Sequence, residues 1–202
     1  MLDKHVVPRI RPALGKMAAV LDRQGLRADT VTVAGFACGV ACIIAVALGQ
    51  TQLALVLLLL NRLADGLDGE LARLHKPTDA GGYLDITLDF IFYAMFPLGF
   101  AFSDPVHNAV PAAVLIASFV GTGASFLAFA TQAEKRDIVS PDFGYKGLYY
   151  LNGLAEGTET IICFVLMCLF PQHFAILAWL FAVICVITAI NRVYFGYRTL
   201  RT

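Results

Sequence analysis

The chain alternates long apolar runs with short polar connections. Six runs are candidates for membrane-spanning helices, covering residues 31–49, 53–65, 83–102, 109–130, 160–170 and 173–194. Residues 1–26 instead mix basic with apolar residues, as interfacial helices do, and Pro8 and Pro12 are expected to break the helix. We therefore predict an all-α, polytopic membrane protein. It should form a single domain over residues 1–202, with an N-terminal interfacial amphipathic helix over 1–27 and a core of six transmembrane helices over 28–202.

Composition supports the membrane assignment and excludes two other classes of protein. Hydrophobic residues make up 58% of the 202 positions and charged residues 15%, whereas an ordinary soluble domain carries about 25% charge. Fifteen Lys and Arg balance fifteen Asp and Glu, so the chain lacks the basic excess with which proteins neutralise nucleic-acid phosphates. We expect a lipid bilayer as its surroundings, no nucleic-acid partner and no large soluble domain.

Positive charge is confined to alternate connections. All Lys and Arg residues lie in the N-terminal segment, from the end of the second span into the turn that follows, between the fourth and fifth spans, or at the C-terminal end. The connections around Gln50, Asp104 and Gln172 contain none. Cytoplasmic loops carry the excess of Lys and Arg in membrane proteins. The distribution therefore predicts that both termini are cytoplasmic.

Four aspartates interrupt the second and third predicted spans. Asp65 and Asp68 share one helical face, and so do Asp85 and Asp89. Residues 53–64 cover only about 18 Å of a hydrocarbon layer roughly 30 Å thick, so the second helix must continue through Arg73. A short turn then makes the two spans antiparallel neighbours, and the carboxylates should converge just inside the cytoplasmic boundary.

Such a cluster needs compensation. Each carboxylate costs about 3 kcal/mol at a helix centre, and four that share a site repel one another unless protons or cations balance them. An all-oxygen cluster suits Mg²⁺ or Mn²⁺ better than zinc. The sequence therefore predicts a divalent metal site.

The aspartates belong to a longer motif that resembles the signature of the CDP-alcohol phosphotransferase (CDP-alcohol phosphatidyltransferase) family. The motif reads Asp65-x-x-Asp68-Gly69-x-x-Ala72-Arg73 followed by Gly81-x-x-x-Asp85-x-x-x-Asp89. Seven residues separate Arg73 from Gly81, where the family usually has eight, and we expect the turn to absorb this difference. The resemblance implies an enzyme of phospholipid biosynthesis that lies in the bacterial inner membrane and forms a homodimer. It would transfer a substituted phosphate from a CDP-linked lipid to the hydroxyl of a small polar alcohol, releasing CMP.

The resemblance also implies roles for individual residues, and the residue types suit them. Metal ligands would be Asp65, Asp68 and Asp85, with Asp89 as the catalytic general base and a further metal ligand. Glycine at position 69 allows close approach of a nucleotide, and an arginine fork binds phosphate. The nucleotide and diphosphate would contact Thr32, Gly69, Ala72, Arg73 and Gly81.

The acceptor is less constrained. The basic residues on the cytoplasmic side are Lys135, Arg136, Lys146 and Arg192, and they favour a phosphorylated alcohol such as glycerol 3-phosphate or inositol phosphate. As lipid-headgroup anchors they would have no part in acceptor binding. Glu156 and Glu159 favour serine or an amino alcohol instead. We expect CDP-diacylglycerol as donor and a phosphorylated acceptor.

Two other classes of membrane protein carry similar aspartates. A membrane prenyltransferase would also bind a diphosphate through Mg²⁺, but typically has about nine spans, and it would release pyrophosphate. A cation transporter would release neither product, and its carboxylates tend to lie at the membrane midplane. CMP release therefore separates all three.

Overall fold

The computed structural model describes residues 2–136, 138 and 153–201, and within these ranges it is all-helical. The elements are α1 (Asp3–Arg23), α2 (Ala28–Ala47), α3 (Thr51–Leu74), α4 (Asp79–Ser103), α5 (Pro105–Glu134), α6 (Gly157–Leu169), the short 3₁₀ helix η1 (Pro171–His173) and α7 (Phe174–Arg201). The predicted all-α class is confirmed.

Four helical segments are long and apolar enough to cross a membrane. Within the described residues these are α2, α4, α5 and the segment formed by η1 with α7. α3 has 24 residues and runs through Arg73 as predicted, but its second half is charged, while α6 has only 13 residues. The structure thus supports four spans, and the count of six stays a prediction in which α3 and α6 supply the other two.

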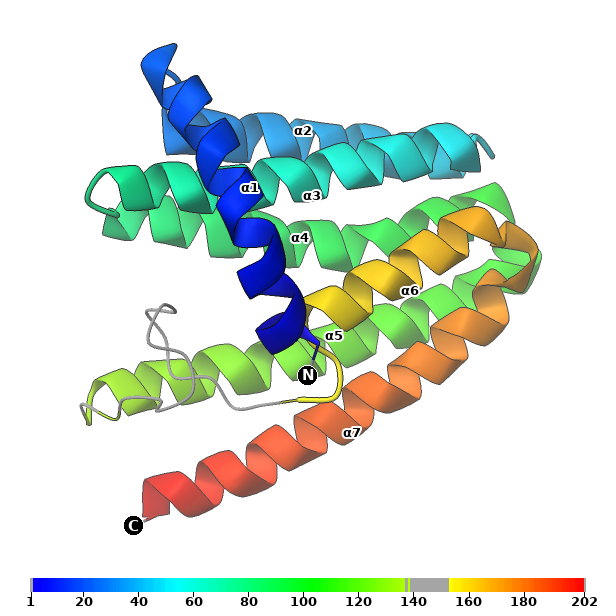
Figure 1. The fold of residues 1–202 in the computed structure, drawn as a ribbon. Coiled ribbons are helices and arrows are strands. Elements are labelled where there is room, and N and C mark those ends of the chain that lie inside the picture. The colour runs from blue at the N-terminus through cyan, green and yellow to red at the C-terminus, as the bar shows by residue number, and fades with distance from the viewer. Residues whose placement is uncertain (1, 137, 139–152, 202) are drawn as a thin grey trace.

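Helices α2 to α7 run back and forth between the two ends of a bundle (Figure 1). α2 packs on both α3 and α4, α5 packs on α4 and α7, and α6 packs on α3 and α7. The connections α2–α3, α4–α5 and α6–α7 all lie at one end of the bundle, at the right of Figure 1. These are the three connections without Lys or Arg, so the charge segregation seen in the sequence corresponds to one end of the molecule.

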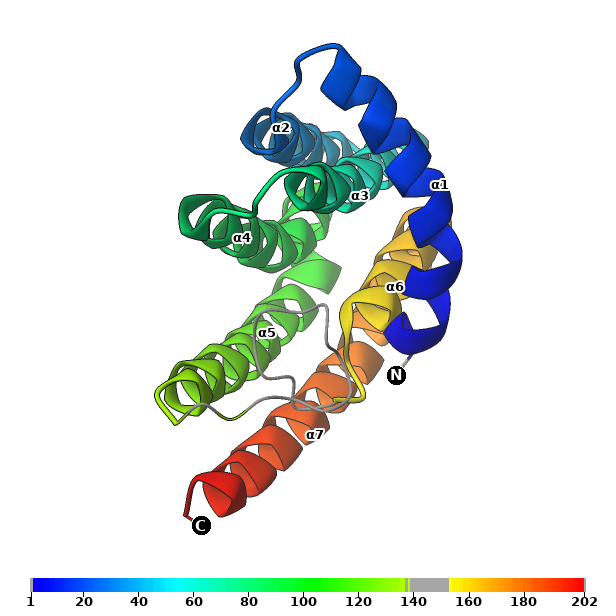
Figure 2. The same cartoon turned by 60° about the vertical axis from the view of Figure 1, so that its left-hand side comes forward.

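α1 lies across the bundle instead of along it (Figure 2). Ala18 packs against Leu67 and Leu71 of α3, and the first residues of α1 lie near the start of α6. The expected break at Pro8 and Pro12 is wrong, because both prolines lie inside one continuous helix. Both are exposed, so the carbonyl groups that lose a helical hydrogen bond lie on the face away from the protein core.

A row of phenylalanines fixes the orientation of α4. Phe96 stacks on Phe164 of α6 with ring centroids 3.9 Å apart, and Phe100 stacks on Phe174 of α7 at 4.3 Å. These side chains are fully buried. Because residues three or four apart share a helical face, the same stripe continues toward the start of α4 through Asp89 and Asp85. Aromatic packing deep in the bundle therefore aims the carboxylates toward α3.

Candidate metal and nucleotide site

Three of the four predicted carboxylates converge. Asp65 of α3 and Asp85 and Asp89 of α4 each offer one carboxylate oxygen, and these three oxygens lie within 4.8 Å of one another. All three residues are half-buried. The turn between the helices, one residue shorter than usual, has therefore not rotated the aspartates away from each other.

Asp68 lies beside this trio, one turn further along α3. Only 3% of the residue is exposed. None of the described residues donates a hydrogen bond to its buried Oδ2 atom. A buried carboxylate oxygen without a partner costs free energy. The position of Asp68 and its unsatisfied oxygen are therefore those expected of a cation ligand. Asp65, Asp68, Asp85 and Asp89 all line one small pocket between α2, α3 and α4.

A larger cleft adjoins the carboxylates. Its volume is about 810 Å³, and it lies where α3 ends, α4 begins and the chain passes from α1 to α2. Asp68 and Asp85 belong to both the cleft and the carboxylate pocket. The cleft also contains every residue predicted to contact the nucleotide, namely Thr32, Gly69, Ala72, Arg73 and Gly81.

Two glycines of the motif sit where side chains would crowd the cleft. A Cβ atom at Gly81 would come within 3.1 Å of both Asp29 Oδ1 and Thr78 Oγ1. The Gly81 backbone N–H donates to Thr78 Oγ1 at 3.1 Å, which caps the start of α4. A Cβ at Gly69 would lie 3.3 Å from the guanidinium of Arg73. Glycine at both positions keeps the cleft open and its polar groups close together.

Arg73 is held in the cleft by partners that the sequence analysis missed. Its Nη2 atom lies 2.6 Å from Glu70 Oε1, and the same oxygen accepts from Arg11 Nε at 2.9 Å. The Glu70–Arg73 spacing on one helix could have indicated the first contact. The second depends on where α1 crosses α3, which the sequence pattern does not fix.

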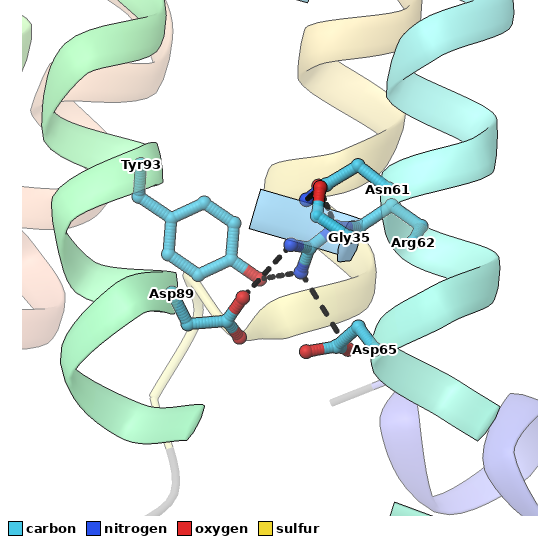
Figure 3. A network of polar contacts seen from close by, with 6 residues as sticks. All are labelled: Gly35, Asn61, Arg62, Asp65, Asp89 and Tyr93. Atoms are coloured by element: carbon cyan, nitrogen blue, oxygen red, sulfur yellow. Dashed lines mark hydrogen bonds and ion pairs between the residues drawn. The ribbon is translucent and has the colours of Figure 1, made fainter. Parts of the chain in front are cut away.

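Arg62 is a functional residue of the site that the sequence motif does not contain. Its guanidinium donates to Asp89 Oδ1 at 2.8 Å and lies 3.6 Å from Asp65 Oδ2 (Figure 3). It also donates to the Tyr93 hydroxyl at 2.9 Å and to Asn61 Oδ1 at 2.8 Å. The structure places this positive charge inside the acidic cluster.

The predicted acceptor residues do not gather in one place. Arg192 is buried and lines a cavity of about 460 Å³ between α4, α5, α6 and α7, together with Glu156. Lys135 and Arg136 follow the end of α5, are exposed and do not line this cavity, and Arg136 bonds to the backbone carbonyl of Leu200. Lys146 lies outside the described residues.

Arg192 itself is fixed by its surroundings. Its Nη1 atom donates to the carbonyl of Thr122 at 3.1 Å, and its guanidinium lies 5.4 Å from the centre of the Phe126 ring. Tyr93 lines the same cavity, and its hydroxyl contacts Arg62. The cavity therefore adjoins the aspartates through Tyr93.

A helical membrane protein with clustered carboxylates beside a cleft at its helix ends has the features of an enzyme that handles a charged group at the membrane surface. The family model of CDP-alcohol phosphatidyltransferase matches residues 26–191. The chain therefore belongs to the CDP-alcohol phosphatidyltransferase family. It is a membrane transferase of phospholipid biosynthesis, as the motif implied.

Similar proteins agree with this assignment. The inner membrane protein YnjF of Escherichia coli K12 is 52% identical over 202 residues, which are all of this chain and 98% of that protein. The phosphatidylinositol phosphate synthase PgsA1 of Mycobacterium tuberculosis has the same fold. Its crystal structure with CDP-DAG bound gives a TM-score of 0.73 at 22% identity, covering 91% of this chain and 93% of that one. Its complex with manganese and citrate gives 0.72 at 24%, covering 91% and 88%.

Proposed function

We propose that this chain transfers the phosphatidyl group of CDP-diacylglycerol to the hydroxyl of a small polar alcohol and releases CMP. The observation that carries the proposal is the convergence of Asp65, Asp85 and Asp89 beside a cleft that holds all the predicted nucleotide contacts. The choice of donor is supported by the family and by the CDP-DAG bound to PgsA1.

The carboxylates fit Mg²⁺ or Mn²⁺. They offer only oxygen ligands, their oxygens are close enough to share an ion, and the buried Oδ2 of Asp68 is unsatisfied among the described residues. Asp65, Asp68 and Asp85 would hold the ion, with Asp89 beside them. When bound, such an ion neutralises the diphosphate and stabilises the departing CMP phosphate. PgsA1, whose fold is similar, has been crystallised with manganese.

The chain's own residues account for the remaining steps. The cleft around Gly69 and Gly81 receives the nucleotide, and the Arg73 guanidinium donates hydrogen bonds to phosphate oxygens. The acceptor oxygen attacks the phosphorus that carries the diacylglycerol. The bond from that phosphorus to CMP breaks, and the acceptor's proton passes to the Asp89 carboxylate.

We infer the remaining features of the molecule from the same pattern. The chain is a single domain in the bacterial inner membrane, with six spans, an interfacial segment over residues 1–27 that contains α1, and both termini in the cytoplasm. The relative from E. coli supports the location, and the Lys- and Arg-free end of the bundle supports the orientation. The family resemblance favours a homodimer.

For the acceptor we propose a phosphorylated alcohol such as glycerol 3-phosphate or inositol phosphate. Arg192 supports this choice, since it is a buried cation in a cavity that adjoins the aspartates. Glu156 lines the same cavity and favours the second candidate, serine or an amino alcohol. Lys135, Arg136 and Lys146 would attract an anionic acceptor from the cytoplasmic side.

The test is CMP release by purified protein in lipid. The protein would be given CDP-diacylglycerol with glycerol 3-phosphate, inositol phosphate, serine or choline in separate reactions. We expect release with a phosphorylated alcohol. CMP release with serine or choline alone would show that the acceptor is an amino acid or amino alcohol and not a phosphorylated alcohol. CMP release with none of the four acceptors would contradict CDP-diacylglycerol as the donor. Pyrophosphate release from a prenyl diphosphate would identify the protein as a prenyltransferase. Metal transport without release of CMP or pyrophosphate would identify it as a cation transporter.

A further inference from the structure

Glu70 connects the crossing helix α1 to the nucleotide cleft. Its Oε1 atom accepts hydrogen bonds from two cations, Arg73 Nη2 at 2.6 Å and Arg11 Nε at 2.9 Å. The Glu70 side chain is only 12% exposed, and a carboxylate with so little water around it needs paired charges. Glu70 occupies one of the unspecified positions between Gly69 and Ala72. The motif itself therefore assigns it no role.

The Arg73 guanidinium lies between Glu70 and the backbone of Gly69. A Cβ atom at Gly69 would come 3.3 Å from Nη2, 3.6 Å from Nη1 and 3.7 Å from Cζ, so the whole planar group lies where a side chain at position 69 would be. Arg73 and Gly69 line the cleft, whereas Glu70 does not. A guanidinium has five N–H donors, so the bond to Glu70 leaves donors for a phosphate. Glu70 therefore acts on a bound nucleotide through Arg73.

Apolar packing sets the place of Arg11 on α3. Leu14, three residues further along α1, packs on Gly66, where a Cβ atom would come within 2.8 Å of Leu14 Cδ1. Ala18 is fully buried in the same contact with α3. Residues 11, 14 and 18 share one helical face. The crossing of α1 that Figure 2 shows therefore also brings Arg11 to Glu70.

We propose that Glu70 is a positioning residue that orients Arg73 toward the phosphates of the CDP-linked donor, and that Arg11 of α1 holds Glu70 in place. An arginine side chain loses rotational freedom when it binds a phosphate, and fixing it beforehand removes this cost from donor binding. Helix α1 thus contributes to the donor site without touching the donor. The inference rests on the proposed function and deepens its donor half.

Two other roles for Glu70 lead to different results. If Glu70 holds Arg73 away from the donor, neutralising Glu70 releases the guanidinium and donor binding tightens. If Glu70 only fastens α1 to α3, its loss lowers the amount of folded protein but leaves the donor affinity of the folded fraction unchanged. A positioning residue weakens donor binding and leaves kcat nearly unchanged, because the phosphate contact stabilises the ground state and the transition state alike.

The experiment measures the binding of CDP-diacylglycerol to purified protein in mixed micelles by equilibrium titration, and CMP release gives KM and kcat. Glu70→Gln removes the charge at nearly constant shape. Glu134→Gln, at the exposed end of α5, is the matched control. We expect Glu70→Gln to weaken donor binding and to raise the KM for the donor about tenfold, because Arg73 must then be ordered by the donor itself. The control should behave as the wild type does.

Arg11→Gln tests the part assigned to α1. It should weaken donor binding severalfold, less than Glu70→Gln does, because Glu70 still contacts Arg73. Lys16→Gln removes an exposed cation from the same helix and should be silent. In an Arg73→Gln background, Glu70→Gln should add little further loss of donor binding, since Glu70 acts through Arg73. A multiplicative loss in that double variant would overturn the proposal.

Folding is monitored by size-exclusion chromatography. Unchanged or tighter donor binding by folded Glu70→Gln overturns the inference, and wild-type binding by Arg11→Gln overturns the part assigned to α1. If Glu70→Gln does not fold, Arg11→Gln decides: weaker donor binding supports the inference, and wild-type binding overturns it. No binding of CDP-diacylglycerol by the wild type would contradict the proposed donor and this inference together. Weaker binding by Glu70→Gln without CMP release from any acceptor would support the role of Glu70 and contradict the proposed transfer alone.

Discussion

At the scale of single residues, the unsatisfied carboxylate oxygen of Asp68 is the clearest indication that the site requires a cation. Its Oδ2 atom is buried and accepts no hydrogen bond from the residues described. If Asp68 binds a metal ion, Asp68→Asn should weaken Mn²⁺ binding and lower turnover by orders of magnitude, because an amide is a poorer ligand. Asp79→Asn, at the start of α4, is the control and should be silent. Full activity of the wild type in excess chelator would contradict the metal requirement.

Asp89 leads to a different expectation from the other aspartates. Asp89→Asn should retain binding of the CDP-lipid while transfer falls about 10² to 10⁴-fold, which is the usual cost of removing a general base. Binding is measured by equilibrium titration with a CDP-lipid, and transfer by CMP release. Loss of donor binding in this variant would show that Asp89 is mainly a metal ligand.

The sequence identified the aspartates but not their partners, and the reason is geometric. Spacings of three and four residues define a face of one helix, so the convergence of Asp65 with Asp85 and Asp89 was predictable. The contact of Arg62 with Tyr93 depends on the depth at which α3 and α4 are aligned, which periodicity leaves open. Arg192 could have been assigned inward, since it continues the buried stripe of Cys185 and Thr188.

At the scale of elements, close helix contacts depend on glycines. A Cβ atom at Gly99 of α4 would come 2.9 Å from both the Ile43 carbonyl oxygen and Val46 Cβ of α2. Gly99→Ala should therefore force α2 and α4 apart and cost about 1 to 3 kcal/mol. Gly121→Ala is the control, because its new methyl would meet Ala189 at 3.8 Å, an ordinary contact. Thermal unfolding in detergent compares them, and equal midpoints would contradict the packing argument.

Most helix ends were predictable from the sequence, but the unbroken course of α1 through its two prolines was not. Apolar length located both ends of α2, α4 and α5 and the start of α7 within four residues, but α7 continues seven residues past the predicted end at Tyr194. The need to reach the cytoplasmic side predicted that α3 would run past Asp68. The break expected at Pro8 and Pro12 is wrong, because the carbonyl groups that each proline leaves without a helical hydrogen bond lie on the exposed face of α1, where solvent can satisfy them. Both prolines are exposed, so α1 continues through them.

At the scale of the whole molecule, the proposed topology places one end of the bundle outside the cytoplasm. Thr51→Cys, Pro105→Cys and Gln172→Cys, each in a cysteine-free background, should react with a membrane-impermeant maleimide added to intact cells. Arg201→Cys should react only after the membrane is opened. The expectation follows from the absence of Lys and Arg in these three connections. Labelling of the first three sites only in opened cells would invert the orientation.

The proposed function has a consequence for the cleft at the ends of α3 and α4. If its donor is a lipid that stays in the bilayer, that donor reaches Gly69 and Gly81 by lateral diffusion, and its effective concentration is its mole fraction in the membrane. Adding inert phospholipid to vesicles at fixed total CDP-diacylglycerol should therefore slow CMP release. Diluting the same vesicles with buffer, at a constant acceptor concentration, should leave the rate of CMP release unchanged. The rate per protein molecule would then report how crowded the membrane surface is with donor.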